Sequence, residues 1–139
     1  MSEKRSTFRF QEFRILRSTI DFANVSDDDF KIDINPKGIF NKATKLYTLT
    51  LEVKVINNLN FEVMIILAES QFIFDDDFDE IPNYFTINAP AITFPYIRAY
   101  VAALSALSGI GMLNLPILNL VDLAEQLKGN FSVVEKAEE

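Results

Sequence analysis

Neither cysteine nor histidine occurs in the 139 residues of this chain. Without cysteine, no disulfide, thiolate nucleophile or cysteine-ligated metal site can form. Without histidine, the chain lacks the commonest general base and the commonest transition-metal ligand. Ser–His and Cys–His nucleophile systems are therefore excluded. We predict that the protein is not an enzyme and that it has no metal site and no cofactor.

Glycine and positive charge are also scarce. The four glycines include no glycine-rich loop ending in Lys-Ser or Lys-Thr, so we expect a function that does not use ATP. The 13 basic residues are outnumbered by 20 acidic ones, and the net charge is −7. An acidic surface repels phosphate backbones, which argues against a nucleic-acid partner. The first ten residues, MSEKRSTFRF, have no apolar core of a signal peptide, and together with the missing cysteines this predicts a cytoplasmic location.

Charge is absent from one long stretch, the 23 residues from position 99 to position 121. This length is close to that of a membrane-spanning helix. Two glycines, a proline and two asparagines interrupt the stretch, at Gly109, Gly111, Asn114, Pro116 and Asn119. No basic cluster follows it, so we predict no stable membrane insertion.

Alternating apolar residues predict strands in the first two-thirds of the chain. The clearest runs from 45 to 57, where Tyr47, Leu49 and Leu51 would share one face and Thr48 and Thr50 the other. The alternation between 8 and 24 changes parity twice, which indicates one long strand with bulges. The predicted strands are about 8–24, 29–35, 45–57 and 60–74, the predicted helices are about 95–108 and 119–129, and 131–139 is an acidic tail. This order predicts an α+β fold, with a four-stranded antiparallel sheet followed by two C-terminal helices in a single domain over 1–139.

The acidic runs Asp27–Asp29 and Asp75–Glu80 have two interpretations. They lack the spacing of a calcium-binding loop, which favours solvated turns. Alternatively, they attract basic segments of a partner. The first predicted helix is apolar on nearly every side, since Arg98 is its only charge. One subunit cannot cover all of that surface, so we predict an oligomer.

Several motifs resemble the SecB family of export chaperones. They are Phe94-Pro95-Tyr96 with Arg98, then Leu113-Asn114-Leu115 with Asn119, the segment Phe30–Ile34, and Arg14-Ile15 with Ile20 and Phe22. The order of the predicted strands and helices also matches that family along nearly the whole chain. The resemblance implies a homotetramer, a dimer of dimers with the first helices packed between the dimers. It implies that Tyr100, Val101, Leu104 and Leu107 lie in that interface.

The resemblance also implies a groove for unfolded polypeptide, walled by the segment that joins the two helices. The candidate groove residues there are Ile110, Met112, Leu113, Leu115 and Ile117. Two aromatic residues complete the set. Phe78 lies among acids in a polar loop, and Phe85 follows that loop, with a place in the core as the alternative for Phe85.

The function implied is that of an ATP-independent holdase, which binds unfolded or pre-secretory polypeptides for protein export and translocation. In the family, acids on the outer face of the sheet dock the SecA motor, but Thr19, Ala23 and Leu67 stand near those positions here. Asp21 and Glu69, close by in sequence, are the candidate docking acids. The alternative is a SecB-like chaperone or assembly factor dedicated to a specific partner, such as an antitoxin, without delivery to SecA. A small-molecule carrier is a third hypothesis.

Overall fold

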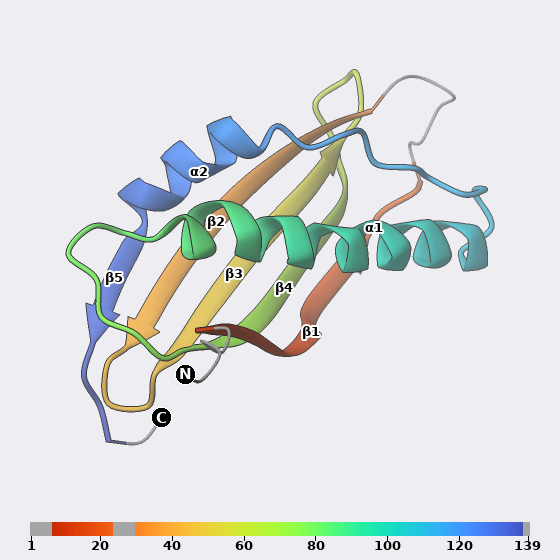
Figure 1. Ribbon diagram of the computed structural model, residues 1–139. Helices are drawn as coiled ribbons and strands as arrows, with labels where there is room; N and C mark the ends of the chain where they lie inside the picture. Colours follow the sequence, from red (N-terminus) through yellow and green to blue (C-terminus); the bar gives the residue numbers. More distant parts are fainter. Residues whose placement is uncertain (1–6, 24–29, 138–139) are drawn as a thin grey trace.

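A computed structural model of the chain describes residues 7–23 and 30–137 (Figure 1). The acidic run Asp27–Asp29 lies outside these residues. The strands are β1 (Phe8–Ile20), β2 (Lys31–Asn41), β3 (Leu46–Ile56), β4 (Glu62–Phe74) and β5 (Phe131–Val134). A π-helical turn, η1 (Tyr84–Asn88), leads into helix α1 (Ala89–Leu107), and helix α2 (Leu120–Gly129) precedes β5.

The sheet has five strands in the order β1-β4-β3-β2-β5. The first four pair antiparallel, but β5 pairs parallel with β2, with Phe131 opposite Gly38. The prediction of a four-stranded antiparallel sheet was therefore wrong in strand number and type. The fifth strand lies in the segment that we expected to be a tail. Four residues are too few for a recognisable alternation, and their pairing partner lies far away in the sequence.

Both helices cover one face of the sheet, and α1 crosses in front of the strands in Figure 1. The alternation of β3 determines this arrangement, because every second residue from Tyr47 to Val55 is fully buried. The intervening residues, such as Thr48 and Glu52, remain partly exposed on the face without helices. The predicted bulges in β1 are confirmed, since its register against β4 shifts between Phe10 and Glu12 and again between Ile15 and Arg17.

Aromatic residues gather at one end of the core, near the β2–β3 turn. Phe85 lies at the centre of this cluster, stacked on Tyr47 with the ring centroids 4.0 Å apart. The Tyr47 hydroxyl donates a hydrogen bond to the carbonyl of Phe85 at 3.1 Å. Burial raises the pKa of the Tyr47 phenol, because the charged phenolate would lose its hydration. The cluster is Phe8, Phe40, Tyr47, Phe72, Phe74, Phe78, Tyr84, Phe85 and Phe131.

Two prolines lie inside elements that we expected them to bound, Pro36 as the end of a strand and Pro95 as the start of a helix. Strand β2 continues through Pro36 as far as Asn41. The amides of Gly38 and Lys42 donate to the carbonyls of Asn130 and Val134, so the even-numbered residues of β2 direct their N–H groups to the edge where β5 pairs. Pro36 shares this parity, and β5 begins only opposite Gly38, so its missing N–H removes no hydrogen bond of the sheet. Helix α1 begins at Ala89 instead of Pro95, and Pro90 occupies its first turn.

Candidate functional site

Helix α1 is held on the sheet by polar and aromatic contacts along its length. The Thr93 hydroxyl donates to the Ser70 hydroxyl of β4 at 2.8 Å, in a buried position. The hydroxyls of Tyr100 and Ser18 of β1 lie 2.8 Å apart. The Tyr96 ring stacks on Phe13, with centroids 5.0 Å apart. These contacts fix which side of α1 faces away from the sheet.

The segment that joins the helices, residues 108–119, is called the linker here. It reverses direction directly after α1, where Gly109 and Gly111 adopt φ values of 92° and 90°. The linker is then tied to α1 at two places. The amide of Leu113 donates to the Ser105 hydroxyl at 2.8 Å, and the Arg98 guanidinium donates to the carbonyl of Pro116 at 3.2 Å. The linker therefore runs back along α1 in a defined position.

The two ties give the linker side chains a fixed orientation. Leu113 and Leu115 point into the core and are buried. Met112 is 64% exposed and Ile117 is 91% exposed. Ile110 and, in the first turn of α2, Val121 are exposed as well. We call these four exposed residues, Ile110, Met112, Ile117 and Val121, the linker surface.

Helix α2 starts at a fixed point because Asn119 caps it. The Asn119 side-chain oxygen accepts hydrogen bonds from the amides of Val121 and Asp122 at 3.1 and 3.2 Å. The sequence favours this cap, because asparagine is one of the residues preferred at a helix N-cap. Asp122 in the first turn interacts favourably with the positive end of the helix dipole. Leu123 and Leu127 bury the inner side of α2 against the core.

A groove of about 210 Å³ lies between the first residues of β2 and the junction of the linker with α2. It is lined by Ile32, Asp33, Ile34, Ile117, Leu118, Asn119, Asp122, Leu123 and Gln126. We call it the linker groove. Five of these side chains are apolar, and two carboxylates and two amides stand among them. An apolar cleft with a few polar groups is typical of a binding site. The two acids would favour a ligand with positive charge beside its apolar part.

The predicted groove residues are divided among three places. Ile117 lines the linker groove, while Ile110 and Met112 lie on the linker surface. Leu113 and Leu115 belong to the core. Phe78 and Phe85 lie elsewhere, in the aromatic cluster beside Phe40, where Phe85 is fully buried and Phe78 is partly buried.

The predicted interface residues also differ in exposure. Val101 is fully buried against the sheet of its own subunit, and Tyr100 and Leu104 are partly buried. Leu107, at the end of α1, is 88% exposed. The side of α1 that faces away from the sheet carries Ile92, Ala99, Ala103 and Leu107, all exposed. We call these four residues the α1 stripe, because their spacing of seven and four places them along one helix face.

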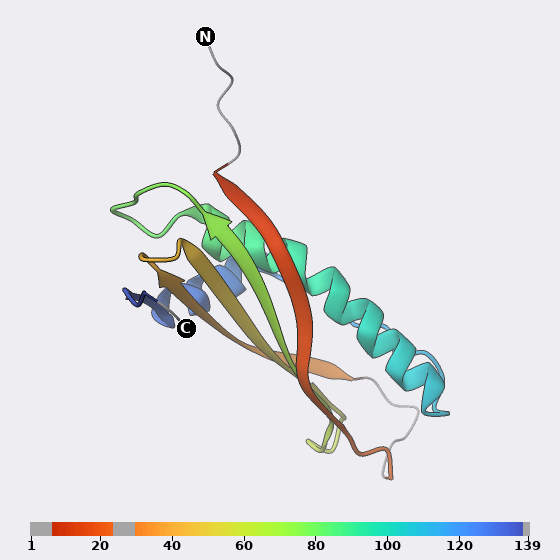
Figure 2. The same cartoon turned by 90° about the horizontal axis from the view of Figure 1, so that it is seen from below.

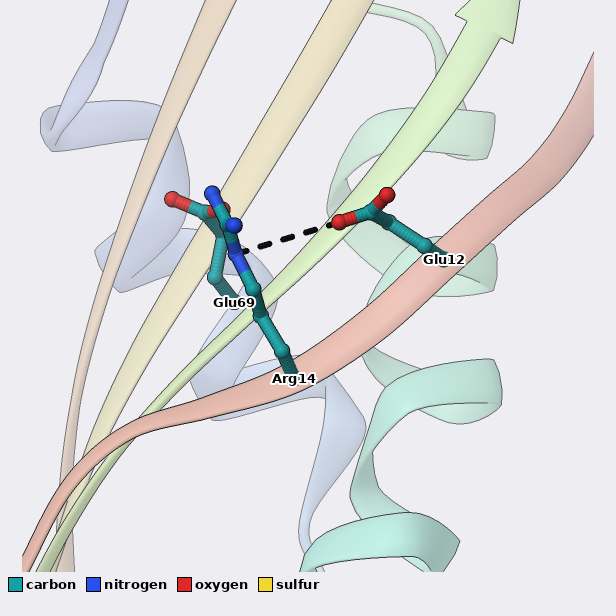
Figure 3. A network of polar contacts seen from close by, with 3 residues as sticks. All are labelled: Glu12, Arg14 and Glu69. Carbon is teal, nitrogen blue, oxygen red and sulfur yellow. Dashed lines mark hydrogen bonds and ion pairs between the residues drawn. The ribbon is translucent and has the colours of Figure 1, made fainter.

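The two candidate docking acids differ in their surroundings. Glu69 lies on the face of the sheet without helices and accepts hydrogen bonds from the Arg14 guanidinium at 2.9 and 3.0 Å (Figure 3). Arg14 lies 3.8 Å from Glu12 as well. The charge of Glu69 is thus paired within the chain. Asp21 is exposed beyond the end of β1 and accepts from the amide of Ala23.

Sequence reasoning missed the contribution of β2 and of α2 to the groove. Ile32 and Ile34 were assigned to a strand, but nothing in their local pattern indicates that the linker passes nearby. The signal that was present is the unusual absence of charge between Arg98 and Asp122, which correctly marked the linker as apolar. Within the described residues, no group of three or more acidic side chains is placed to hold a metal ion. No helix among them combines the length and apolar character needed to cross a bilayer.

No protein-family model matches this sequence, and no curated protein matches it by sequence comparison. Among solved structures, the chain is similar to the Mycobacterium tuberculosis SecB-like chaperone Rv1957, in complex with a ChAD peptide from the Rv1956 HigA1 antitoxin. The TM-score is 0.67 at 17% sequence identity, over 81% of this chain and 88% of that chain. A protein of unknown function from Streptococcus agalactiae matches with a TM-score of 0.44 at 9% identity, over 79% of this chain and 97% of that chain. The chain therefore has a SecB-like fold.

Proposed function

We propose that this protein is an ATP-independent chaperone, which binds extended non-native segments of a polypeptide along the linker surface and in the linker groove. The observation that carries the proposal is the exposure of Ile117. An apolar side chain that is 91% exposed gains nothing for the fold of its own subunit. It is nevertheless held outward by a linker that is hydrogen-bonded to α1 at Leu113 and at Pro116, the residue directly before Ile117. An apolar surface of this kind is typical of a protein-binding site.

The shape and charge of the groove indicate the kind of client. Its apolar side chains provide contacts for one or two aliphatic or aromatic residues, and a groove open to solvent accepts an extended chain that continues beyond it. Asp33 and Asp122 among the lining residues favour lysine or arginine next to the apolar part of that chain. Such binding requires no catalytic step. The chaperone would keep its client from aggregating by mass action.

Assembly of several subunits belongs to this proposal. The α1 stripe presents small and apolar residues along one helix face that no part of the described subunit covers. Small side chains such as Ala99 and Ala103 permit close packing of a second helix. A homotetramer, with the α1 helices between two dimers, would bury this stripe. It would also bring several linker surfaces together for one client.

We favour a client dedicated to this chaperone over general protein export. The structural neighbour Rv1957 was solved with a peptide of one specific antitoxin, and this supports the dedicated role. The candidate acids for docking SecA support export poorly, because Glu69 is already paired with Arg14. A dedicated chaperone needs the groove and the linker surface but no motor-docking face.

The test is a binding and protection assay. Overlapping peptides from unrelated proteins are titrated against the chain, and we expect binding only to apolar segments flanked by lysine or arginine, with an affinity that falls as salt is added. In parallel, several unrelated aggregating proteins are diluted from denaturant in the presence of the chain. Protection of most of them indicates a general holdase, and protection of few supports a dedicated role. If no peptide binds and no protein is protected, the proposal is wrong.

A further inference from the structure

Strand β5 covers only part of the edge of β2. The two strands pair over Gly38–Asn41 and Phe131–Val134, with the Gly38 amide donating to the Asn130 carbonyl at 3.2 Å and the Lys42 amide donating to the Val134 carbonyl at 2.9 Å. Within residues 7–23 and 30–137, no strand lies beside the rest of this edge, from Lys31 to Lys37. The backbone groups of Ile32 and Ile34 have the same parity as Gly38, so they also point to the open edge.

The open part of this edge connects the linker groove with β5. Ile32 and Ile34 line the linker groove. The next three residues of β2 line a second hollow of about 420 Å³, which is closed on its far side by the start of β5. Its lining is Asn35, Pro36, Lys37, Asn130, Phe131 and Ser132. An extended chain that left the linker groove along β2 would therefore meet β5 directly.

Hydrogen bonds from Asn130 and Lys136 to β2 flank strand β5, and Phe131 packs the strand against the aromatic cluster. The Phe131 ring packs against Phe85, Phe78 and Tyr47, with centroids 5.8, 6.2 and 6.3 Å away. The position opposite Phe131 is Gly38, where a Cβ atom would come within 2.5 Å of the Tyr47 hydroxyl. Glycine thus lets the Tyr47 ring lie against β2 and form part of an aromatic wall at the edge. Ser132 and Val133 are exposed.

We infer that the edge of β2 beneath β5 is a second binding site for client polypeptide, and that β5 fills it while no client is bound. This inference rests on the proposed chaperone function. The segment that fits is an extended strand, parallel to β2, with an aromatic residue in the place of Phe131. Such a segment would form backbone hydrogen bonds with β2 and place its ring on Tyr47, Phe78 and Phe85. Phe78 and Phe85 would then contact client after all, although they lie apart from the linker groove.

The experiment locks β5 onto β2 in the full chain. Ile39 and Ser132 are Cα partners in the parallel pair, on the side of the sheet away from the aromatic cluster, and the natural chain has no cysteine. The double substitution Ile39→Cys with Ser132→Cys therefore creates a single possible intramolecular disulfide, and Ser132→Cys alone, kept alkylated, is the matched control. The probe is reduced, carboxymethylated α-lactalbumin, a permanently unfolded protein, with binding followed by fluorescence anisotropy.

We expect the oxidised double variant to bind this probe about tenfold more weakly than the same protein after reduction, since the site under β5 is then closed. Reduction should restore the affinity of the double variant to that of the alkylated control. A second full-chain variant, Phe131→Ala, loosens β5 and should bind the probe more tightly. A peptide with the sequence FSVVEK should compete with the probe for Phe131→Ala, and SSVVEK should not.

The outcomes separate this inference from the proposed function. If the natural chain binds the probe, but the oxidised double variant binds it equally well or better, β5 does not cover a client site. The inference is then wrong, while the proposed function stands. If Phe131→Ala binds no more tightly and FSVVEK competes no better than SSVVEK, the aromatic part of the inference is wrong. Failure of the natural chain to bind any unfolded probe contradicts the proposed function and this inference together.

Discussion

The substitution Ile117→Asp separates a binding role from a structural role at the linker surface. Because the Ile117 side chain is 91% exposed, its replacement should change the free energy of unfolding by no more than about 0.5 kcal/mol. Covering an isoleucine side chain with client contributes about 1.5 to 3 kcal/mol. Losing that contribution weakens binding by about 10- to 150-fold. The new carboxylate would also lose its hydration where apolar client residues cover it, and this moves the effect toward the larger value.

The assay for Ile117→Asp is anisotropy of a labelled unfolded protein, combined with thermal unfolding and light scattering of the variant. Ile117→Leu keeps the apolar surface and should retain affinity. Leu59→Asp places the same charge on another exposed apolar residue, in the β3–β4 turn, which does not line the linker groove. Binding of Ile117→Asp within twofold of the natural chain, or an equal loss in Leu59→Asp, would refute the assignment of this surface.

Three further predictions concern assembly and the core. Ala99→Glu with Ala103→Glu should lower the mass of the assembly measured by light scattering, because both residues lie on the α1 stripe. The helical circular dichroism should stay the same. An unchanged mass would show that the stripe is not an interface. Leu115→Ala should reduce the free energy of unfolding by about 2 to 4 kcal/mol, because Leu115 is buried, in contrast to Ile117. A thermal midpoint equal to that of the natural chain would contradict the place of Leu115 in the core. Tyr47 should stay protonated in alkali while the native fold persists, so unfolding at high pH should increase the phenolate absorbance, and Tyr47→Phe should reduce this increase. Because the pKa of Tyr47 is raised in the folded state, ionisation of this phenol favours unfolding. The contribution of the neutral phenol to the free energy of unfolding is therefore present below a pH of about 10 and is lost as the pH rises above that value.

The sequence predicted the regular part of the fold well because its signals are local. Tyr47 to Val55 alternate with polar residues, and this alternation alone determines which face of β3 is buried. The same applies to the Asn119 cap and to the bulges of β1. Pro36 misled the prediction, because a proline does not interrupt an edge strand when its missing N–H points away from any neighbouring strand. Pro95 was predicted to start a helix, but α1 begins at Ala89 and continues through Pro95.

The site was harder to predict because it depends on contacts between distant segments. The sequence marked the linker as apolar, but it does not reveal that Ser105 and Arg98 tie the linker down and turn Leu113 and Leu115 inward. Ile32 and Ile34 become part of a groove only because the start of β2 lies beside the linker. The parallel pairing of β5 with β2 likewise joins segments about 90 residues apart, which no local pattern records.

The most direct test of the central claim is methyl NMR of the full chain during titration with an unfolded polypeptide. The isoleucine and methionine methyl groups of Ile117, Met112, Ile32 and Ile34 report on the linker surface and the linker groove. We predict that these resonances shift or broaden first, while that of Ile65, on the opposite face of β4, stays in place. Perturbation confined to the face without helices, or no perturbation at any concentration of client, would contradict the claim that the linker surface binds polypeptide.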